Sequence, residues 1–265
     1  MSEPLPSEIA EALRLTADRR GPFGEPAYFF SETASTNDIA AALADAGAPE
    51  GATVIAASQT AGRGRFGRTW FSPPGAGLYM STVVREPRLL PILPLAAGVA
   101  VAEGVRAGTG LPVFLKWPND VVVESGVTPT RRRKLAGVLA EASTGADGLQ
   151  YAVLGIGINL RPASYPRDIA DRATSIESEL GRTPDAGAVL AEILVGLARC
   201  READAPDILR RWRELAPSAC GSAVEWDGPA GVVSGVAAGI DDTGALLVHA
   251  NGGIERILSG EVRWI

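Results

Sequence analysis

Residues 113–123 read Val113-Phe-Leu-Lys-Trp-Pro-Asn-Asp-Val-Val-Val123. β-Branched and aromatic residues on both sides of a Pro-Asn pair predict two strands, Val113–Trp117 and Asp120–Val123, joined by a turn. The turn brings an ammonium (Lys116), an amide (Asn119) and a carboxylate (Asp120) to the end of an apolar strand. The plainest interpretation is a polar turn beside a buried tryptophan, but a lysine after Val-Phe-Leu is costly to bury unless it is paired. Asp120 can pair with it or hold a magnesium ion through oxygen.

Hydrophobic periodicity on either side of this stretch predicts a mixture of helices and strands, followed by a strand-rich tail. Residues 161–172, rich in Pro, Arg and Asp, predict a mobile loop. Residues 218–265 carry short alternating strands with turn signals, which predict a small antiparallel barrel and a domain boundary near Pro217, between 1–217 and 218–265. The other expected elements are strands Thr53–Ser58, Leu78–Val84, Arg133–Ala142 and Tyr151–Leu160, and helices Ser7–Arg19, Ser35–Ala46 (with a side-chain cap from the Ser-Thr-Asn start), Leu93–Arg106 and two between Asp185 and Ala216.

Composition excludes several classes of protein. The 265 residues are 46% hydrophobic and 21% charged, which is typical of a globular fold, and the net charge of −6 argues against a general nucleic-acid or anionic-membrane binder. The longest uncharged apolar run, Leu89–Ala102, is shorter than the roughly 20 residues of a membrane span, and no signal peptide is recognisable at the start, so we expect a cytoplasmic protein. Two cysteines and the single His249 exclude Cys-His chemistry and a multi-histidine metal site.

Lysine is rare in this chain. Only Lys116 and Lys134 interrupt a basic set of 25 residues that is otherwise arginine. In a chain that otherwise uses arginine, a lysine can indicate that its compact ammonium is required at that position. Before the context is considered, chance explains the two lysines equally well.

A glycine-rich basic segment, Gly62-Arg-Gly-Arg-Phe-Gly-Arg68, formally matches the GxGxxG dinucleotide fingerprint. The match is spurious, because Pro73 and Pro74 follow where a helix would have to begin. What remains is a flexible loop with three guanidinium groups, which favours anion binding over a solvated hairpin.

Two further segments end in residues that suit a ligand. Lys134-Leu-Ala-Gly137 offers an ammonium that can neutralise a carboxylate or a developing phosphorane charge, while the arginines before it, residues 131–133, are by default a solvated hairpin tip. Gly155-Ile-Gly-Ile-Asn159 places glycines inside a buried strand, where they mark either a close approach to the backbone or a bulge packed under a helix.

Together, Ser35-Thr-Asn37, Gln59 with the glycine–arginine loop, Lys116–Asp120, Lys134–Gly137 and Gly155–Asn159 occur in the order typical of biotin protein ligases. The sequence resembles that family from about residue 28 to the C-terminus. The resemblance implies an α/β (α+β) fold: a mixed-sheet catalytic domain related to class II aminoacyl-tRNA synthetases, followed by an SH3-like barrel. It also implies the monofunctional type, without the N-terminal DNA-binding domain of some members, and hence no DNA partner.

The resemblance implies two half-reactions. Biotin is first activated by ATP, supplied with Mg²⁺, as biotinyl-5′-AMP, and the biotinyl group is then transferred to a lysine of the biotin carboxyl carrier domain of an acyl-CoA carboxylase. No tightly bound metal is implied. The acting residues would be Lys134, Arg65 and Asp120, the last with a possible contact to Mg²⁺. Biotin would be held by Ser35, Thr36, Asn37, Gln59, Arg63, Gly64, Arg65, Lys134, Gly137, Gly155 and Gly157, and ATP by Arg63, Arg65, Arg68, Trp70, Lys116, Asn119 and Asn159.

Two alternatives stay open: a lipoate or octanoate ligase of the same fold, and a biotin-sensing module without turnover. The sequence also leaves open the identity of the carrier, the order of substrate binding, the role of the barrel, and whether the protein is a monomer or a homodimer.

Overall fold

The computed structural model describes residues 2–125, 131–145, 148–228 and 231–265. A seven-stranded mixed sheet carries the first part of the chain, in the order β1-β2-β3-β7-β6-β5-β4; β1 and β2 are parallel and the other pairs antiparallel. Its strands are β1 (Ala27–Phe30), β2 (Thr53–Ala56), β3 (Gly77–Val84), β4 (Phe114–Lys116), β5 (Asp120–Ser125), β6 (Arg131–Gly145) and β7 (Gly148–Asn159).

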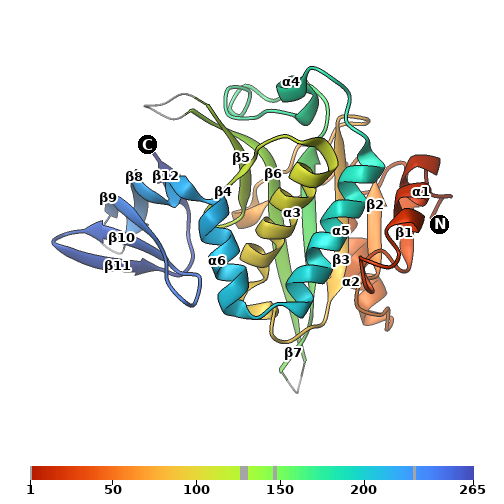
Figure 1. Cartoon of the computed structure of the whole chain (residues 1–265), viewed down its shortest axis with the longest axis horizontal. Coiled ribbons are helices and arrows are strands. Elements are labelled where there is room, and N and C mark those ends of the chain that lie inside the picture. The colour runs from red at the N-terminus through yellow and green to blue at the C-terminus, as the bar shows by residue number, and fades with distance from the viewer. Residues whose placement is uncertain (1, 126–130, 146–147, 229–230) are drawn as a thin grey trace.

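Helices cover both faces of this sheet. On one face α3 (Leu93–Thr109) packs against α5 (Ala186–Glu202) and α6 (Ala205–Leu215), and α1 (Ser7–Leu15) packs against α5 (Figure 1). On the other face α2 (Thr36–Asp45) packs on β2, β3 and β7. The pleat explains the two cores: Ile55 of β2 joins the large cluster beneath α3, whereas its neighbour Val54 joins a smaller cluster beneath α2.

The segment Leu90–Thr109 is long and apolar enough to cross a membrane by length and composition, and it is the one such helix in the described part of the chain. Within the fold, however, 67% of that stretch is buried. Its all-round apolar surface is therefore explained by its place at the centre of the helical layer.

The strand-rich tail forms a second, five-stranded antiparallel sheet, in the order β11-β10-β9-β8-β12. Its strands are β8 (Cys220–Gly228), β9 (Gly231–Ile240), β10 (Leu246–Ala250), β11 (Gly253–Ile257) and β12 (Val262–Trp264), and they follow a short 3-10 turn at Pro217–Ala219. In Figure 1 this sheet lies beside α6 and the β4–β5 end of the main sheet.

The predicted mixture of helices and strands is confirmed, with each predicted element present and its ends shifted by a few residues. Two short elements were missed: β1, and α4 (Ile176–Leu180), which Ser175 caps by accepting a hydrogen bond from the Ser178 amide. Residues 161–172 form no helix or strand, as predicted.

The predicted side-chain cap at the start of α2 is wrong, since no side chain of that segment caps the helix. Instead, the Thr36 amide donates to Gln59 Oε1 at 2.9 Å. The free amide of the first turn is thus satisfied by a side chain that follows β2.

Candidate active site

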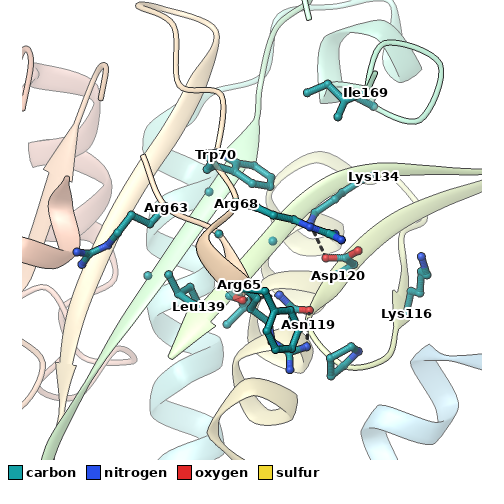
Figure 2. A pocket seen from close by; sticks show the side chains of 18 of the residues that line it. Arg63, Arg65, Arg68, Trp70, Lys116, Asn119, Asp120, Lys134, Leu139 and Ile169 are labelled. Carbon is teal, nitrogen blue, oxygen red and sulfur yellow. Dashed lines mark hydrogen bonds and ion pairs between the residues drawn. The ribbon is translucent and has the colours of Figure 1, made fainter. Parts of the chain in front are cut away.

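One cavity of about 570 Å³ opens on the face of the main sheet between the loop after β2 and the last residues of the second sheet. Strands β6 and β7 form its floor, and residues 165–173 and 260–265 contribute to its walls. Figure 2 shows the cationic part of this cavity, from Arg63 to Lys116. Every site residue predicted from the sequence lines the cavity: Ser35, Thr36, Asn37, Gln59, Arg63, Gly64, Arg65, Arg68, Trp70, Lys116, Asn119, Asp120, Lys134, Gly137, Gly155, Gly157 and Asn159.

A chain of uncharged polar groups crosses one end of the cavity. Gln59 Oε1 accepts from the amide and the hydroxyl of Thr36, at 2.9 and 3.1 Å. The buried Ser81 hydroxyl lies 2.6 Å from Thr36 Oγ1 and 2.5 Å from Asn37 Oδ1, and Gln59 Nε2 donates to Ser72 Oγ at 3.0 Å. This end of the cavity therefore offers hydroxyl and amide groups in fixed positions.

The side chain of Asn37 is fixed at both ends. Its Nδ2 donates to Glu141 Oε2 at 2.5 Å, and its Oδ1 lies so close to strand β7 that a Cβ on Gly155 would approach it to 2.3 Å. Glu141 also accepts from Arg63 Nη2 at 2.9 Å, and Arg63 Nη1 binds Asp38 at 2.7 Å. Sequence reasoning missed Ser81, Ser72 and Glu141, because each is a single polar residue without a motif around it.

Trp70 lies flat against bare backbone. A Cβ on Gly157 would come within 2.4 Å of its indole Nε1, and a Cβ on Gly137 within 3.0 Å of Cζ3. The Lys134 ammonium lies over the same ring, 5.1 Å from its centroid. Because Gly137 and Gly157 have no side chains, the indole of Trp70 can pack against strands β6 and β7. The Lys134 ammonium then makes a cation–π contact with that indole.

Lys134 is held by its side chain and by its backbone. Nζ pairs with Asp120 Oδ1 at 2.5 Å (Figure 2), so the carboxylate expected to pair with Lys116 or to hold Mg²⁺ pairs with Lys134 instead. The Lys134 amide donates to the Arg172 carbonyl at 2.6 Å, and the Lys134 carbonyl accepts from the Thr174 amide at 3.0 Å. Asn159, predicted at the nucleotide, donates to the Thr174 carbonyl at 2.9 Å and so anchors the segment that holds Lys134.

Lys116 has no such partner: among the described residues no carboxylate comes within ion-pair distance of its ammonium. Burial lowers the pKa of Lys116, while the nearby charge of Asp120 opposes that shift. A desolvated cation that lines the cavity is suited to a ligand with several negative charges.

The three guanidinium groups of the glycine–arginine loop diverge rather than converge on one point. Arg63 is directed away from Lys134 and Asp120 (Figure 2), toward Asp38 and Glu141. Arg65 is half-buried, and its Nη1 donates to Asn119 Oδ1 at 3.4 Å; burial lowers the pKa of its guanidinium. Arg68 pairs with Glu261, the residue before β12 of the second sheet.

The default interpretation of Arg131–Arg133 as a solvated hairpin tip is wrong for two of the three. Arg132 pairs with Glu124 at 3.0 Å, and both side chains are largely buried beside Trp264. Arg133 pairs with Glu179 of α4 at 2.9 Å. The partly buried carboxylates of Glu124 and Glu179, which belong to other segments of the chain, pair with these arginines and reduce their exposure to solvent. The local sequence around the arginines does not indicate these partners.

In the described residues no group of three or more His, Cys, Asp or Glu side chains could hold a metal ion. Asp120 is therefore a single carboxylate already engaged by Lys134.

The fold and this cavity define a protein with a binding site that has uncharged hydroxyl and amide groups at one end and cationic side chains at the other. The model of the Biotin/lipoate A/B protein ligase family matches residues 29–159, and that of the Biotin protein ligase C terminal domain matches residues 219–263. The biotin--[acetyl-CoA-carboxylase] ligase of Mycobacterium tuberculosis is 34% identical over 88% of this chain and 86% of its own length. The bifunctional ligase/repressor BirA of Bacillus subtilis is 33% identical, over 90% of this chain and 74% of its own.

The biotin protein ligase from Aquifex aeolicus, solved in complex with biotin and ATP, superposes with a TM-score of 0.77 at 30% identity. The match covers 90% of this chain and 99% of that one. The chain belongs to the biotin protein ligase family.

Proposed function

We propose that this protein is an ATP-dependent ligase that activates biotin as biotinyl-5′-AMP and transfers it to a lysine of a biotin carboxyl carrier domain. One observation carries the proposal: a single cavity joins a neutral polar end, around Thr36 and Gln59, to a cationic end, around Lys116 and Arg65, with Lys134 also lining it. The similar structure from Aquifex aeolicus, solved with biotin and ATP, supports the same pair of substrates.

In the first half-reaction a carboxylate oxygen of biotin attacks the α-phosphorus of ATP. The bond between the α-phosphorus and the oxygen that bridges to the β-phosphorus breaks, pyrophosphate leaves with that oxygen, and a mixed anhydride of biotin and AMP remains. Lys134 sits where an ammonium can screen the carboxylate from the phosphates and stabilise the charge that develops on the phosphorus oxygens. Asp120 orients that ammonium. Mg²⁺ enters as part of the ATP complex, and its charge offsets the repulsion between the phosphates.

In the second half-reaction the amine of the carrier lysine attacks the activated carbonyl carbon, the amide forms, and AMP leaves with the anhydride oxygen. Catalysis then depends on holding the anhydride in place until the carrier docks. We assign Arg65 to the phosphate oxygens, Trp70 to the nucleotide, and Lys116 to the polyphosphate.

The remaining assignments follow the geometry of the cavity. Ser35, Thr36 and Gln59 are assigned to the ureido ring, and Asn37 to the fixed polar wall beside it. The boundary at residue 217 divides a substrate-binding domain from a C-terminal sheet that completes the cavity through Glu261 and Trp264. We infer that the carrier belongs to an acyl-CoA carboxylase, as the names of the relatives suggest, and that the protein acts in the cytoplasm.

Biotin-dependent exchange of pyrophosphate into ATP tests this proposal directly. We expect exchange with biotin and none with lipoate or octanoate, because an apolar dithiolane or alkyl chain leaves the hydroxyl and amide groups of the polar end without the partners that a ureido ring supplies. Exchange that is stimulated equally by lipoate would overturn the assignment, and tight biotin binding without exchange would indicate a sensor instead of an enzyme.

A further inference from the structure

Glu141 of β6 occupies a junction that the reaction described above does not use. Its Oε2 accepts one hydrogen bond from Asn37 of α2 at 2.5 Å and another from Arg63 of the glycine–arginine loop at 2.9 Å. The three residues come from separate parts of the chain, and Asn37 and Glu141 are 104 positions apart. The side chain of Glu141 is 42% exposed, so a carboxylate at this place is not explained by burial in the core.

A carboxylate that is ionised can only accept hydrogen bonds, and this fixes the orientation of the Asn37 amide. Because Glu141 accepts, the Asn37 amide must present Nδ2 to it and Oδ1 to Ser81. At the other end, the Thr36 amide and hydroxyl both donate to Gln59 Oε1, which turns Gln59 Nε2 toward Ser72. Without an obligate acceptor at position 141, the Asn37 amide could rotate by half a turn and present Nδ2 instead of Oδ1 to Ser81, whereas Gln59 would stay fixed by the Thr36 amide.

The same carboxylate fixes one end of the loop. Arg63 stands at its start and is bound by Glu141 and Asp38. Ser72 stands at its end and is bound by Gln59. Both ends of the segment that carries Arg65 and Trp70 are therefore fastened, one to the carboxylates of Glu141 and Asp38 and the other to Gln59, which lines the cavity.

We propose that Glu141 is a positioning residue for biotin: it sets the hydrogen-bond direction of the polar end through Asn37 and fastens the loop through Arg63. The inference rests on the proposed function, since it names the residue that prepares the biotin end of that site. It places the effect on biotin and not on ATP, because Arg63 keeps its ion pair with Asp38 when the charge at position 141 is removed, so the loop that carries Arg65 and Trp70 stays fastened.

The test compares Glu141→Gln with the wild type in biotin-dependent pyrophosphate exchange. Glutamine keeps the length of the side chain, but it removes the charge and adds a donor that can face either Asn37 or Arg63. We expect KM for biotin to rise about 10- to 100-fold, as for loss of a charge-assisted hydrogen bond, while KM for ATP stays within about twofold. Glu141→Asp, which restores an obligate acceptor, should recover part of the affinity.

Glu192→Gln is the matched control, because it removes a carboxylate that pairs with Arg19 at 2.8 Å on α5, away from the cavity. It should leave both KM values unchanged. A second measurement tests whether Glu141 acts through Asn37. In an Asn37→Ala background, Glu141→Gln should raise KM for biotin far less than it does in the wild-type protein.

The inference is overturned if Glu141→Gln leaves KM for biotin within twofold of wild type, or if it raises both KM values equally together with a fall in Tm, which would show a purely structural role. The failure of the proposed function is a different result: the wild-type protein itself would show no exchange with biotin.

Discussion

Gly157→Ala is expected to impair adenylate formation without unfolding the protein. A Cβ at this position would lie 2.4 Å from Trp70 Nε1 and 2.5 Å from Cε2, whereas ordinary contacts begin near about 3.5 Å. Strand β7 is paired on both sides at this point, with Tyr79 of β3 and with Gly137 of β6, so the indole must retreat by about 1 Å. A displacement of that size at a reacting centre costs on the order of 100-fold in rate.

Two more glycines make a graded series in the same assay. Gly137→Ala would bring a Cβ to 3.0 Å from Trp70 Cζ3 and should give a smaller loss, because a shift of a few tenths of an ångström relieves the contact. Gly98→Ala in α3 meets Leu115 at 3.4 Å, an ordinary contact, and should leave exchange unchanged. The reasoning fails if Gly157→Ala, with a normal Tm, retains exchange within threefold of wild type.

Four further predictions concern other parts of the site. Lys134→Ala should lower exchange by about 30- to 1000-fold with the fold intact, since the carboxylate loses its ammonium; a change below twofold would contradict this role. Arg65→Gly should release biotinyl-AMP faster and biotinylate bystander proteins, measured by blotting, and equal labelling by variant and wild type would refute the retention role. Because burial lowers the pKa of Lys116, its charge is lost at a lower pH than that of an exposed lysine. KM for ATP should rise as pH rises through that lowered pKa, Lys116→Arg should move the rise to higher pH, and an unmoved rise would exclude Lys116. Trp117→Phe removes the hydrogen bond from Nε1 to the Gly244 carbonyl and should lower the free energy of unfolding by about 1–3 kcal/mol. The expected result is a fall in Tm of several degrees, and an unchanged Tm would refute this role.

The sequence could predict which residues meet in the cavity, but not how they pair. Lys116 and Asp120 flank one turn, so a pair between them was a natural expectation. The register of β5 on β6 instead places Val122 opposite Lys134 and Asp120 opposite Gly137, with an irregularity after Val121. A bulge of this kind re-aims side chains by one position, and nothing in the local sequence announces it.

Residues that support the motifs from a distance were out of reach of sequence reasoning. Ser81 and Glu141 are single polar residues on strands, and their partners are 44 or more positions away along the chain. Arg132 and Arg133 have the appearance of a solvated run because the carboxylates that bind them, Glu124 and Glu179, belong to another strand and to a helix. Charge pairing across a fold leaves no periodic trace in the sequence.

The glycines show the same limit in another form. A glycine within a buried strand indicates that something comes close to the backbone, and both glycines of Gly155–Asn159 obey this. Yet the groups that approach are Asn37 at Gly155 and Trp70 at Gly157, which belong to the protein itself. Only the pairing of β7 with its neighbours and the path of the loop decide what fills the space.

The segment at residues 116–120 shows why a motif can serve the fold and the site at once. Lys116 and Asp120 are half-buried and line the cavity, whereas Trp117 is 3% exposed and donates from Nε1 to the Gly244 carbonyl at 3.0 Å. Gly244 precedes β10 in the second sheet, the same sheet whose Glu261 binds Arg68 of the loop. A change at Trp117 therefore loosens the wall that carries Glu261, while a change at Lys116 alters only the charge facing the ligand. A variant at Trp117 should therefore change mainly Tm, and a variant at Lys116 mainly KM for ATP. The structural and the chemical role of this turn can thus be measured at two adjacent residues.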